Sequence, residues 1–428
     1  MSLSRRWKLF LTLATIAGIL LRVLHTDDME YKEDEEFNFV HSQDTFFAWL
    51  GMPSGVYIPN PGGSIWCFQI LARLTGAHSP ISLEHSLQAL ALLGIALIIP
   101  FAVRFVHTPD EREPWLWAFA LAMVNPFQIL YQRKLWPEPF FPFFSMIFLA
   151  CWWRRDRFWP AFFWGWVGAV LGQIHMSGFF FAAAFLIASL AIPHSQIAVR
   201  KIKWKAWFFG SVLGAMPLLP WFYEILAHPV HEKFVRGWSE ILQLKFWVFW
   251  FSNPIGFHLG NPLGLLRGQS TWAQLSDFLR YPLILDHASW INAAAHLVQL
   301  VIAAALAVAV FRRGLGIRKW IGPFSNTFIA LVAAGIGFGI LLTATGITIR
   351  RYYMMVGFPL EFVWLAVCLL GAYGTPRART WLGALWVSQV IVSACFVLYI
   401  HTNQGSTQGD YGDAYHLVLK KKAALDQH

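Results

Sequence analysis

The stretch from Arg5 to Phe39 reads RRWKLFLTLATIAGILLRVLHTDDMEYKEDEEFNF and joins an apolar run to an acidic segment. The run from Lys8 to Leu24 is long enough to cross the hydrocarbon core of a membrane, which takes roughly 17 to 25 residues. Basic residues precede this run and no small-residue cleavage site follows it. We therefore expect an anchored helix and not a removed signal peptide.

Apolar stretches of similar length recur to the end of the chain, and we count about eleven in all. The chain is 57% hydrophobic and 13% charged, and its mean hydropathy is +0.50, which is not the composition of a soluble domain. The later predicted spans are 83–105, 115–131, 136–153, 159–174, 177–192, 207–223, 290–311, 320–345, 352–373 and 381–400. The sequence predicts an all-α polytopic membrane protein in which residues 1–428 form one membrane domain.

Basic residues concentrate in alternate connections between the predicted spans. With a cytoplasmic N-terminus, the inward connections are VHTPDERE, RRDR, RKIKWK, RRGLGIRK and GTPRART, most of them basic, as the positive-inside rule requires. The net charge of +10 therefore reports membrane topology, and we predict no nucleic-acid partner.

Three predicted outward segments are too long to be simple connectors: residues 25–82, 224–289 and 401–428. We expect function there. Two amphipathic patterns in the first, EEFNFVHSQDTFFAWL and SIWCFQILARLTG, predict short helices lying at the membrane interface. The second, aromatic and rich in Pro and Gly, resembles a lid or a re-entrant surface.

The sequence carries few signals for cofactor chemistry. The four cysteines are scattered and most fall in or beside predicted spans, so we interpret them as packing residues. No Walker loop or dinucleotide fingerprint occurs, which argues against ATP-driven transport by this chain alone. No group of His, Cys, Asp and Glu has convincing ligand spacing, and we predict no metal-binding residues.

The acidic segment EDEEF admits two interpretations from chemistry alone. If it is helical, Asp34, Asn38 and His41 share one face, while Glu33 and Glu36 point elsewhere. A carboxylate among like charges at a membrane surface gains proton affinity, which suits a general base. Alternatively, the acids form a solvated charge run that caps the first helix and fixes its topology.

The acidic loop directly after an N-terminal span, with its adjacent Asp-Glu pair, resembles the GT-C superfamily of membrane glycosyltransferases, which includes protein O-mannosyltransferases and aminoarabinose transferases. Other stretches are similar to GT-C features in the same order: GVYIPNPGGSIW with Asn60, NPFQILYQRKLWPEPFFPFF with Arg133, Lys134 and Glu138, GQIHMSGFF with His175, TIRRYYMMVGFP with Arg350, Arg351 and Tyr352, and GDYGDAY in the tail. The chain departs from the family at Gly62, where a second Pro is usual, and lacks a large soluble C-terminal domain.

The resemblance implies a catalytic role for Asp34, which would deprotonate or orient the acceptor hydroxyl, with Glu35 as its neighbour. Asp28 is the rival for this role. Glu138 would contact the sugar or acceptor, although an acid at a helix start also stabilises the helix dipole.

The remaining candidates would bind substrate. Arginine binds phosphate oxygens in pairs, so Arg350 and Arg351, with Tyr352, lead as donor-phosphate ligands, followed by Arg133 and Lys134. The alternative for these cations is contact with lipid headgroups. His175 is a further candidate for substrate binding. The alternative is that this histidine has a purely structural role.

A GT-C enzyme would move a sugar from a polyprenyl-phosphate donor to a glycan, lipid or protein acceptor. The resemblance suggests that this happens on the extracytoplasmic face of the bacterial inner membrane. It would contact membrane lipid, and no cofactor is certain, although a requirement for a divalent cation stays open. Two alternatives come from other classes: a secondary transporter or flippase of lipid-linked saccharides, and a noncatalytic scaffold in envelope assembly.

Overall fold

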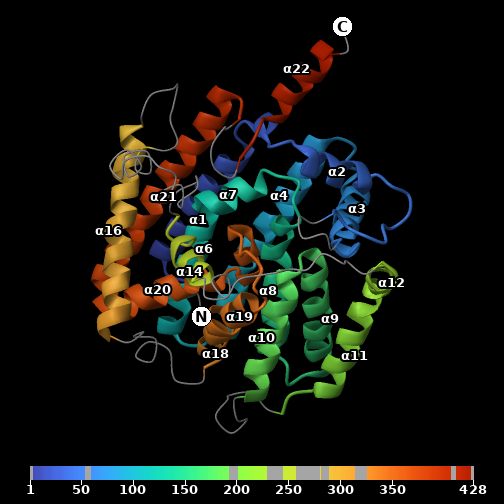
Figure 1. The fold of residues 1–428 in the computed structure, drawn as a ribbon. Coiled ribbons are helices and arrows are strands. Elements are labelled where there is room, and N and C mark those ends of the chain that lie inside the picture. Colours follow the sequence, from blue (N-terminus) through green and yellow to red (C-terminus); the bar gives the residue numbers. More distant parts are fainter. Residues whose placement is uncertain are drawn as a thin grey trace.

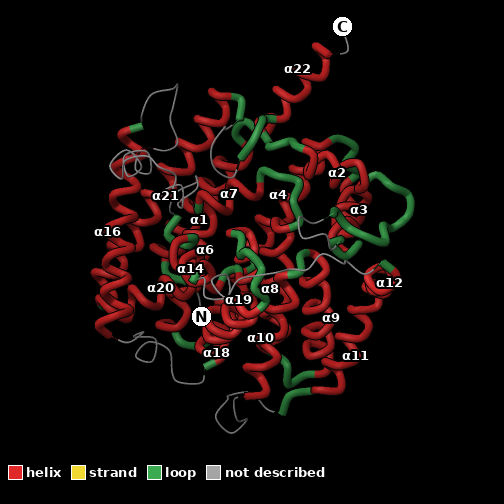
Figure 2. Tube along the Cα trace, viewed as in Figure 1, coloured by secondary structure: helices red, strands yellow, loops and turns green. Residues whose placement is uncertain are grey.

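The computed structural model describes residues 3–53, 59–191, 201–228, 244–256, 280, 289–313, 325–405 and 411–425. Within these ranges the regular structure is helical and includes no strand (Figures 1 and 2). Most of the predicted outward segment 224–289 and residues 314–319 of RRGLGIRK lie outside the described residues. The expectation of a lid or re-entrant surface falls there.

The helices follow the predicted apolar runs. In the N-terminal half they are α1 (Arg5–Val23), α2 (Glu33–Ser42), α3 (Gly63–Thr75), α4 (Pro80–Ala96), α5 (Ile98–Phe105), α6 (Pro109–Val124), α7 (Pro126–Gln132), α8 (Phe141–Trp153), α9 (Phe158–Ile174), α10 (Ser177–Ala191), α11 (Trp204–Ala215) and α12 (Leu219–Ala227). In the C-terminal half they are α14 (Lys245–Ser252), α16 (Trp290–Arg313), α18 (Asn326–Val332), α19 (Phe338–Ala344), α20 (Leu360–Tyr373), α21 (Thr375–Asn403) and α22 (Tyr415–Leu425). Short 3-10 turns lie at Thr26–Asp28 (η1), Glu138–Phe140 (η2) and Arg351–Gly357 (η7).

Several of these helices are long and apolar enough to cross a membrane. Among the described residues the five such segments are Pro80–Phe105, Trp204–Ala227, Trp290–Phe311, Asn326–Ala344 and Thr375–Asn403, and η7 with α20 forms a sixth if this pair, bent by 79°, is one span. The chain is therefore an all-α protein with helices of membrane-spanning length.

Of the other predicted spans, 8–24 corresponds to the unbroken 19-residue α1, which carries four basic residues, and the rest contain shorter or broken helices. The predicted span 115–131, for example, divides into α6 and α7 at Asn125, whose extended backbone is followed by Pro126 at the start of the next helix. Proline has no N–H group to continue the hydrogen bonds of a preceding helix, so the break is local in origin.

Connections predicted to lie on the same side of the membrane contact one another. At one end, Arg379 of GTPRART makes two hydrogen bonds of 2.7 Å with Glu113 of VHTPDERE. At the other end, the first long loop joins the C-terminal tail, because the Tyr415 amide donates to the Met29 carbonyl at 2.8 Å. Figure 1 shows α2, α3 and α22 at this second end, which we term the loop end.

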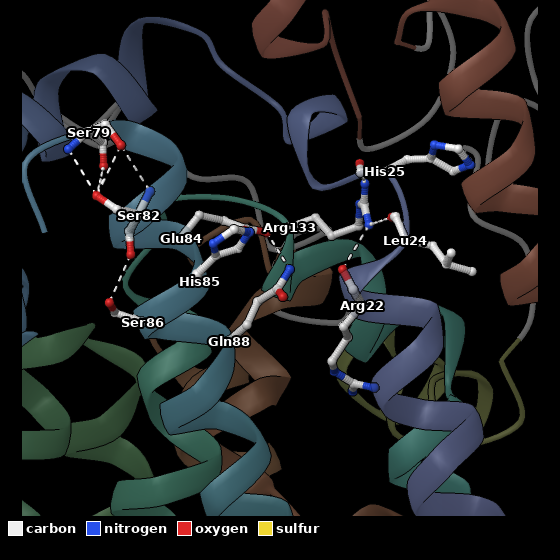
Figure 3. Close-up of polar contacts among 10 residues, drawn as sticks. All are labelled: Arg22, Leu24, His25, Ser79, Ser82, Glu84, His85, Ser86, Gln88 and Arg133. Atoms are coloured by element: carbon white, nitrogen blue, oxygen red, sulfur yellow. Dashed lines mark hydrogen bonds and ion pairs between the residues drawn. The ribbon is translucent and has the colours of Figure 1, made fainter.

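Arg133 fixes the exit of the first helix at the loop end. Its guanidinium donates to the carbonyls of Arg22, Leu24 and His25, in the last turn of α1 and just after it. Figure 3 shows Arg133 between this chain segment and Glu84 of α4. Because the last carbonyls of a helix have no partner within it, a buried cation with several N–H groups can satisfy them.

A buried ion pair attaches the next part of the loop. Glu30 is fully buried and forms ion pairs with Lys134 and Lys32, and the Lys134 side chain is itself 1% exposed. The Glu30 amide also donates to the Arg133 carbonyl at 3.1 Å. The first loop is therefore held against the corner between α7 and α8 by both backbone and side chains.

We expect Lys134→Met to lower the free energy of unfolding by about 3 to 5 kcal/mol, because it removes one cation from a buried carboxylate and leaves that charge poorly compensated. The measurement is chemical denaturation of the purified protein in detergent. Lys421→Met is the matched control, since its ion pair with Asp413 is exposed and should contribute at most about 1 kcal/mol. Equal effects of the two substitutions would contradict this account.

Candidate functional site

A cavity of about 460 Å³ lies at the loop end, where four chain segments meet. They are the first long loop, the corner before α8, the turn between α9 and α10, and the segment that leads into η7. The lining residues are Asp34, Asn38, Met52, Pro53, Asn60, Ser64, Trp136, Pro137, Glu138, Ile174, His175, Met176, Ser177, Phe180, Leu342, Ile347, Thr348, Arg350, Tyr352 and Tyr353.

Asp34 reaches the cavity because of the way α2 begins. The amide of Lys32, at the N-cap, donates to Glu35 Oε2 at 3.0 Å and so directs Glu35 back toward the helix start. Asp34 and Asn38 lie one turn apart and both line the cavity, as their spacing predicts. Asn38 is pinned by a 2.7 Å hydrogen bond from its Nδ2 to the Leu135 carbonyl.

The environment of Asp34 makes it a better proton acceptor than an ordinary aspartate. Loss of water by partial burial raises the pKa of Asp34, and the negative charge of Glu30 adds to this, while Lys32 opposes it. Asp34 also lines a second, more open cavity of about 510 Å³ together with Asp413 of the tail. Its carboxylate therefore lies on a wall shared by the two cavities.

His175 and Glu138 form a second polar group in the cavity. The Ser177 amide donates to His175 Nδ1 at 3.2 Å, so the proton of the neutral ring is on Nε2, which lies 4.0 Å from Glu138 Oε1. Burial lowers the pKa of His175 to about 4, which keeps the imidazole neutral at pH 7. Glu138 Oε2 is buried without a hydrogen-bond partner among the described residues. The pair thus places a ring N–H group and a carboxyl group side by side at the cavity wall.

Arg350 supplies positive charge to the same cavity. Its side chain is exposed and makes no ion pair with any described residue, although it lines the cavity beside Tyr352 and Tyr353. The aromatic rings behind it pack together: the Tyr352 ring lies 5.3 Å from Trp136, and the Tyr353 ring 4.7 Å from His175. Arg350 is therefore positioned on a packed wall and remains available to an anion.

Six of the residues that we predicted from the sequence line this cavity together: Asp34, Asn60, Glu138, His175, Arg350 and Tyr352. Two other predicted residues are close in sequence but point away from it. Glu35 is buried beside the N-cap of α2, and the Arg351 guanidinium lies over the Phe127 ring at 3.9 Å.

The remaining predicted residues also lie outside the cavity lining. Arg133 and Lys134 bind the backbone and the buried carboxylate described above. Asp28 is 2% exposed and is bonded to two histidines of the C-terminal region, at 2.9 and 3.1 Å. Arg133, Lys134 and Asp28 thus make contacts within the protein and not with a ligand in this cavity.

Sequence reasoning did not single out some polar lining residues as site candidates, including Asn38, Ser64, Ser177 and Thr348. Most lie within a few residues of a predicted one, and Asn38 was placed on the face of Asp34. The available indication for these residues was that they lie close in the sequence to stretches that resemble GT-C features. The cavity contains no trio of His, Cys, Asp or Glu side chains close enough to share a metal ion, as far as the described residues show.

Comparison of the chain with family models, with curated proteins and with solved structures finds no match.

The burial of Glu35 gives a test of how α2 is placed. Burial raises the pKa of Glu35 to about 7, and the charge of Glu30 adds to this effect. Below a pH of about 4.5 the residue is protonated in both the folded and unfolded states, and it contributes no pH-dependent penalty. Between about 4.5 and 7 only the unfolded state ionises fully, so stability falls as pH rises.

We therefore expect Glu35→Gln to gain stability relative to the wild type by roughly 1 to 3 kcal/mol between pH 4.5 and pH 8. Unfolding of both proteins in detergent at the two pH values measures this difference. Glu33→Gln serves as control, because Glu33 is exposed in the same helical turn and its removal should leave the difference near zero. A pH-independent effect of Glu35→Gln would count against the burial of its carboxyl group.

Proposed function

We propose that this protein is a glycosyltransferase of the GT-C type, with about eleven spans, that moves a sugar from a polyprenyl-phosphate donor to an acceptor on the extracytoplasmic face of the bacterial inner membrane. The acceptor is a hydroxyl or amine of a glycan, lipid or protein. The observation that carries the proposal is the common cavity of Asp34, Asn60, Glu138, His175, Arg350 and Tyr352. These residues come from distant parts of the sequence, and each was selected by resemblance before any contact was known.

In the proposed reaction the acceptor oxygen or nitrogen attacks the anomeric carbon of the sugar as the bond from that carbon to the phosphate oxygen breaks. The bonding electrons leave with the phosphate, and the acceptor proton passes to the Asp34 carboxylate. Direct displacement of this kind inverts the anomeric centre. The raised pKa of Asp34 supports its role as base, because proton affinity closer to neutral pH makes proton transfer more favourable.

Arg350 would bind the phosphate whose negative charge grows during the reaction. A polyprenyl phosphate is already a good leaving group, so it needs charge stabilisation more than protonation. The support for this assignment is that Arg350 lines the cavity and carries no carboxylate partner among the described residues. A planar guanidinium can donate two parallel hydrogen bonds to phosphate oxygens.

Glu138 and His175 would hold the sugar ring. The His175 Nε2–H group is a donor and the Glu138 carboxyl group lies beside it in the cavity lining, and sugar hydroxyls can bond to both groups. The open cavity that shares Asp34 gives the acceptor a route from water to the base. Donor and acceptor would thus approach Asp34 from different sides.

We expect Asp34→Asn to slow transfer by about 10² to 10⁴-fold, the usual contribution of a positioned general base. Lipid that copurifies with this slow variant should include a phosphoisoprenoid sugar, and mass spectrometry would name its headgroup. The assay then measures how fast the wild-type protein in liposomes consumes that donor when no proton gradient is present. Asp110→Asn is the control and should retain activity, because Asp110 is exposed and lines neither cavity.

Unchanged transfer by Asp34→Asn would remove this residue from the mechanism. Movement of the intact lipid-linked sugar across the liposome membrane, without its consumption, would instead identify a flippase.

We expect Arg350→Gln to weaken donor binding by roughly 10-fold to 100-fold, because a hydrogen bond to a charged group is worth about 1.5 to 3 kcal/mol. The measurement is the KM for the donor in the same liposome assay. Lys420→Gln removes one exposed positive charge from α22 and controls for the general loss of charge. The assignment fails if both substitutions change KM by the same factor.

A further inference from the structure

Three histidines surround a buried aspartate away from the cavity. Asp28 is in η1, directly after α1, and His25 precedes it by three residues. His401 lies in the last turn of α21, and His416 near the start of α22. One nitrogen from His25, one from His401 and one oxygen from Asp28 all lie within 4.8 Å of one another.

The contacts within this group are close. Asp28 Oδ2 lies 2.9 Å from His401 Nδ1, and Asp28 Oδ1 lies 3.1 Å from His416 Nδ1. The rings of His25 and His401 are stacked, with centroids 3.6 Å apart and planes at 21°. The group therefore brings imidazole nitrogens and a carboxylate oxygen together, which are ligand types that zinc-like ions prefer.

The backbone on both sides of the group adopts an uncommon conformation. Among the described residues, His25 and Gln404 are the non-glycine positions with a positive φ, at 53° and 57°. His25 belongs to the group, and Gln404 follows His401 by three residues. Arg133 binds the His25 carbonyl and helps to hold this conformation. Left-handed backbone at non-glycine residues persists where surrounding contacts fix it, and it is frequent at functional sites.

We propose that His25, Asp28 and His401 bind a divalent transition-metal ion of the Zn²⁺ type, with His416 oriented by the second oxygen of Asp28 as a fourth ligand or as a support for the carboxylate. Zinc prefers nitrogen and oxygen ligands at about 2.0 to 2.2 Å in tetrahedral geometry, which places neighbouring ligand atoms roughly 3.4 Å apart. The three ligand atoms lie within 4.8 Å of one another, so their separations would have to shorten by at most about 1.4 Å (4.8 minus 3.4) to reach that spacing.

The ion would fasten the C-terminal tail to the first long loop. The group joins residues far apart in the sequence, and further bonds support the same junction: the Tyr411 hydroxyl donates to the Asp28 carbonyl at 2.6 Å. The first loop carries Asp34 and the tail carries Asp413, and both line the open cavity. None of the four metal-site residues lines either cavity, so the ion would have a structural role and the proposal does not depend on the proposed transferase activity.

The test is metal binding by the purified full-length protein in detergent. We expect about one zinc per chain by elemental analysis after purification without chelators, and saturable binding when the metal-stripped protein is titrated with Zn²⁺. Titration with Co²⁺ should give the visible absorption of a tetrahedral site with histidine and carboxylate ligands. Zn²⁺ should also raise the melting temperature of the stripped protein.

Variants locate the site. Asp28→Asn and His401→Ala should each weaken Zn²⁺ binding by at least 100-fold, and His416→Ala by about 10-fold to 100-fold. His78→Ala is the matched control, because His78 is an exposed histidine of the first long loop. The wild-type titrations test the proposal even if a variant fails to fold, because absence of saturable Zn²⁺ and Co²⁺ binding overturns it. A folded Asp28→Asn variant that binds Zn²⁺ as tightly as the wild type also overturns it.

Discussion

The hydrogen bonds from Arg133 to the end of α1 are the constraint on which the loop end depends. A helix that ends at a membrane surface leaves carbonyls without partners, and a site away from water makes each one costly. One guanidinium reaches three carbonyls at this point, those of Arg22, Leu24 and His25. Lys134, the next residue, then pairs with Glu30. Two adjacent cations thereby set the direction in which the chain leaves the first helix and enters the acidic loop.

This anchoring explains why a segment rich in acids can be rigid enough to build a cavity wall. Four acids in succession at 33–36 would repel one another in an unattached loop. Here they occupy the first turn of α2, where the helix dipole favours negative charge. Glu35 caps the turn, Glu36 pairs with Lys422 of the tail at 2.7 Å, and Asp34 faces the cavity. Glu35 and Glu36 thus have structural roles, whereas Asp34 is available to a ligand.

Much of this arrangement could be predicted from the sequence. Apolar length gave the helices, alternating basic connections predicted which loops contact one another, and helical spacing put Asp34 and Asn38 on one face. The roles of Arg133, Lys134 and Arg351 could not be obtained in that way. Cations outside the basic connections suggested phosphate ligands, but the choice between a phosphate, a carbonyl and an aromatic ring depends on neighbours that are distant in sequence. The same holds for Asp28, whose histidine partners lie more than 370 residues away.

The charge distribution in the cavity bears on which molecule it would accept. A protonated His175 would form an ion pair with Glu138 and occupy the group that is otherwise unpartnered, whereas the bond from the Ser177 amide and the burial of the ring keep it neutral. The cavity therefore contains two carboxyl groups, a neutral donor and one exposed guanidinium. Such a set combines possible partners for an anionic group with possible partners for hydroxyl groups. It is compatible with the donor proposed above, with the phosphate at Arg350 and the sugar hydroxyls at Glu138 and His175.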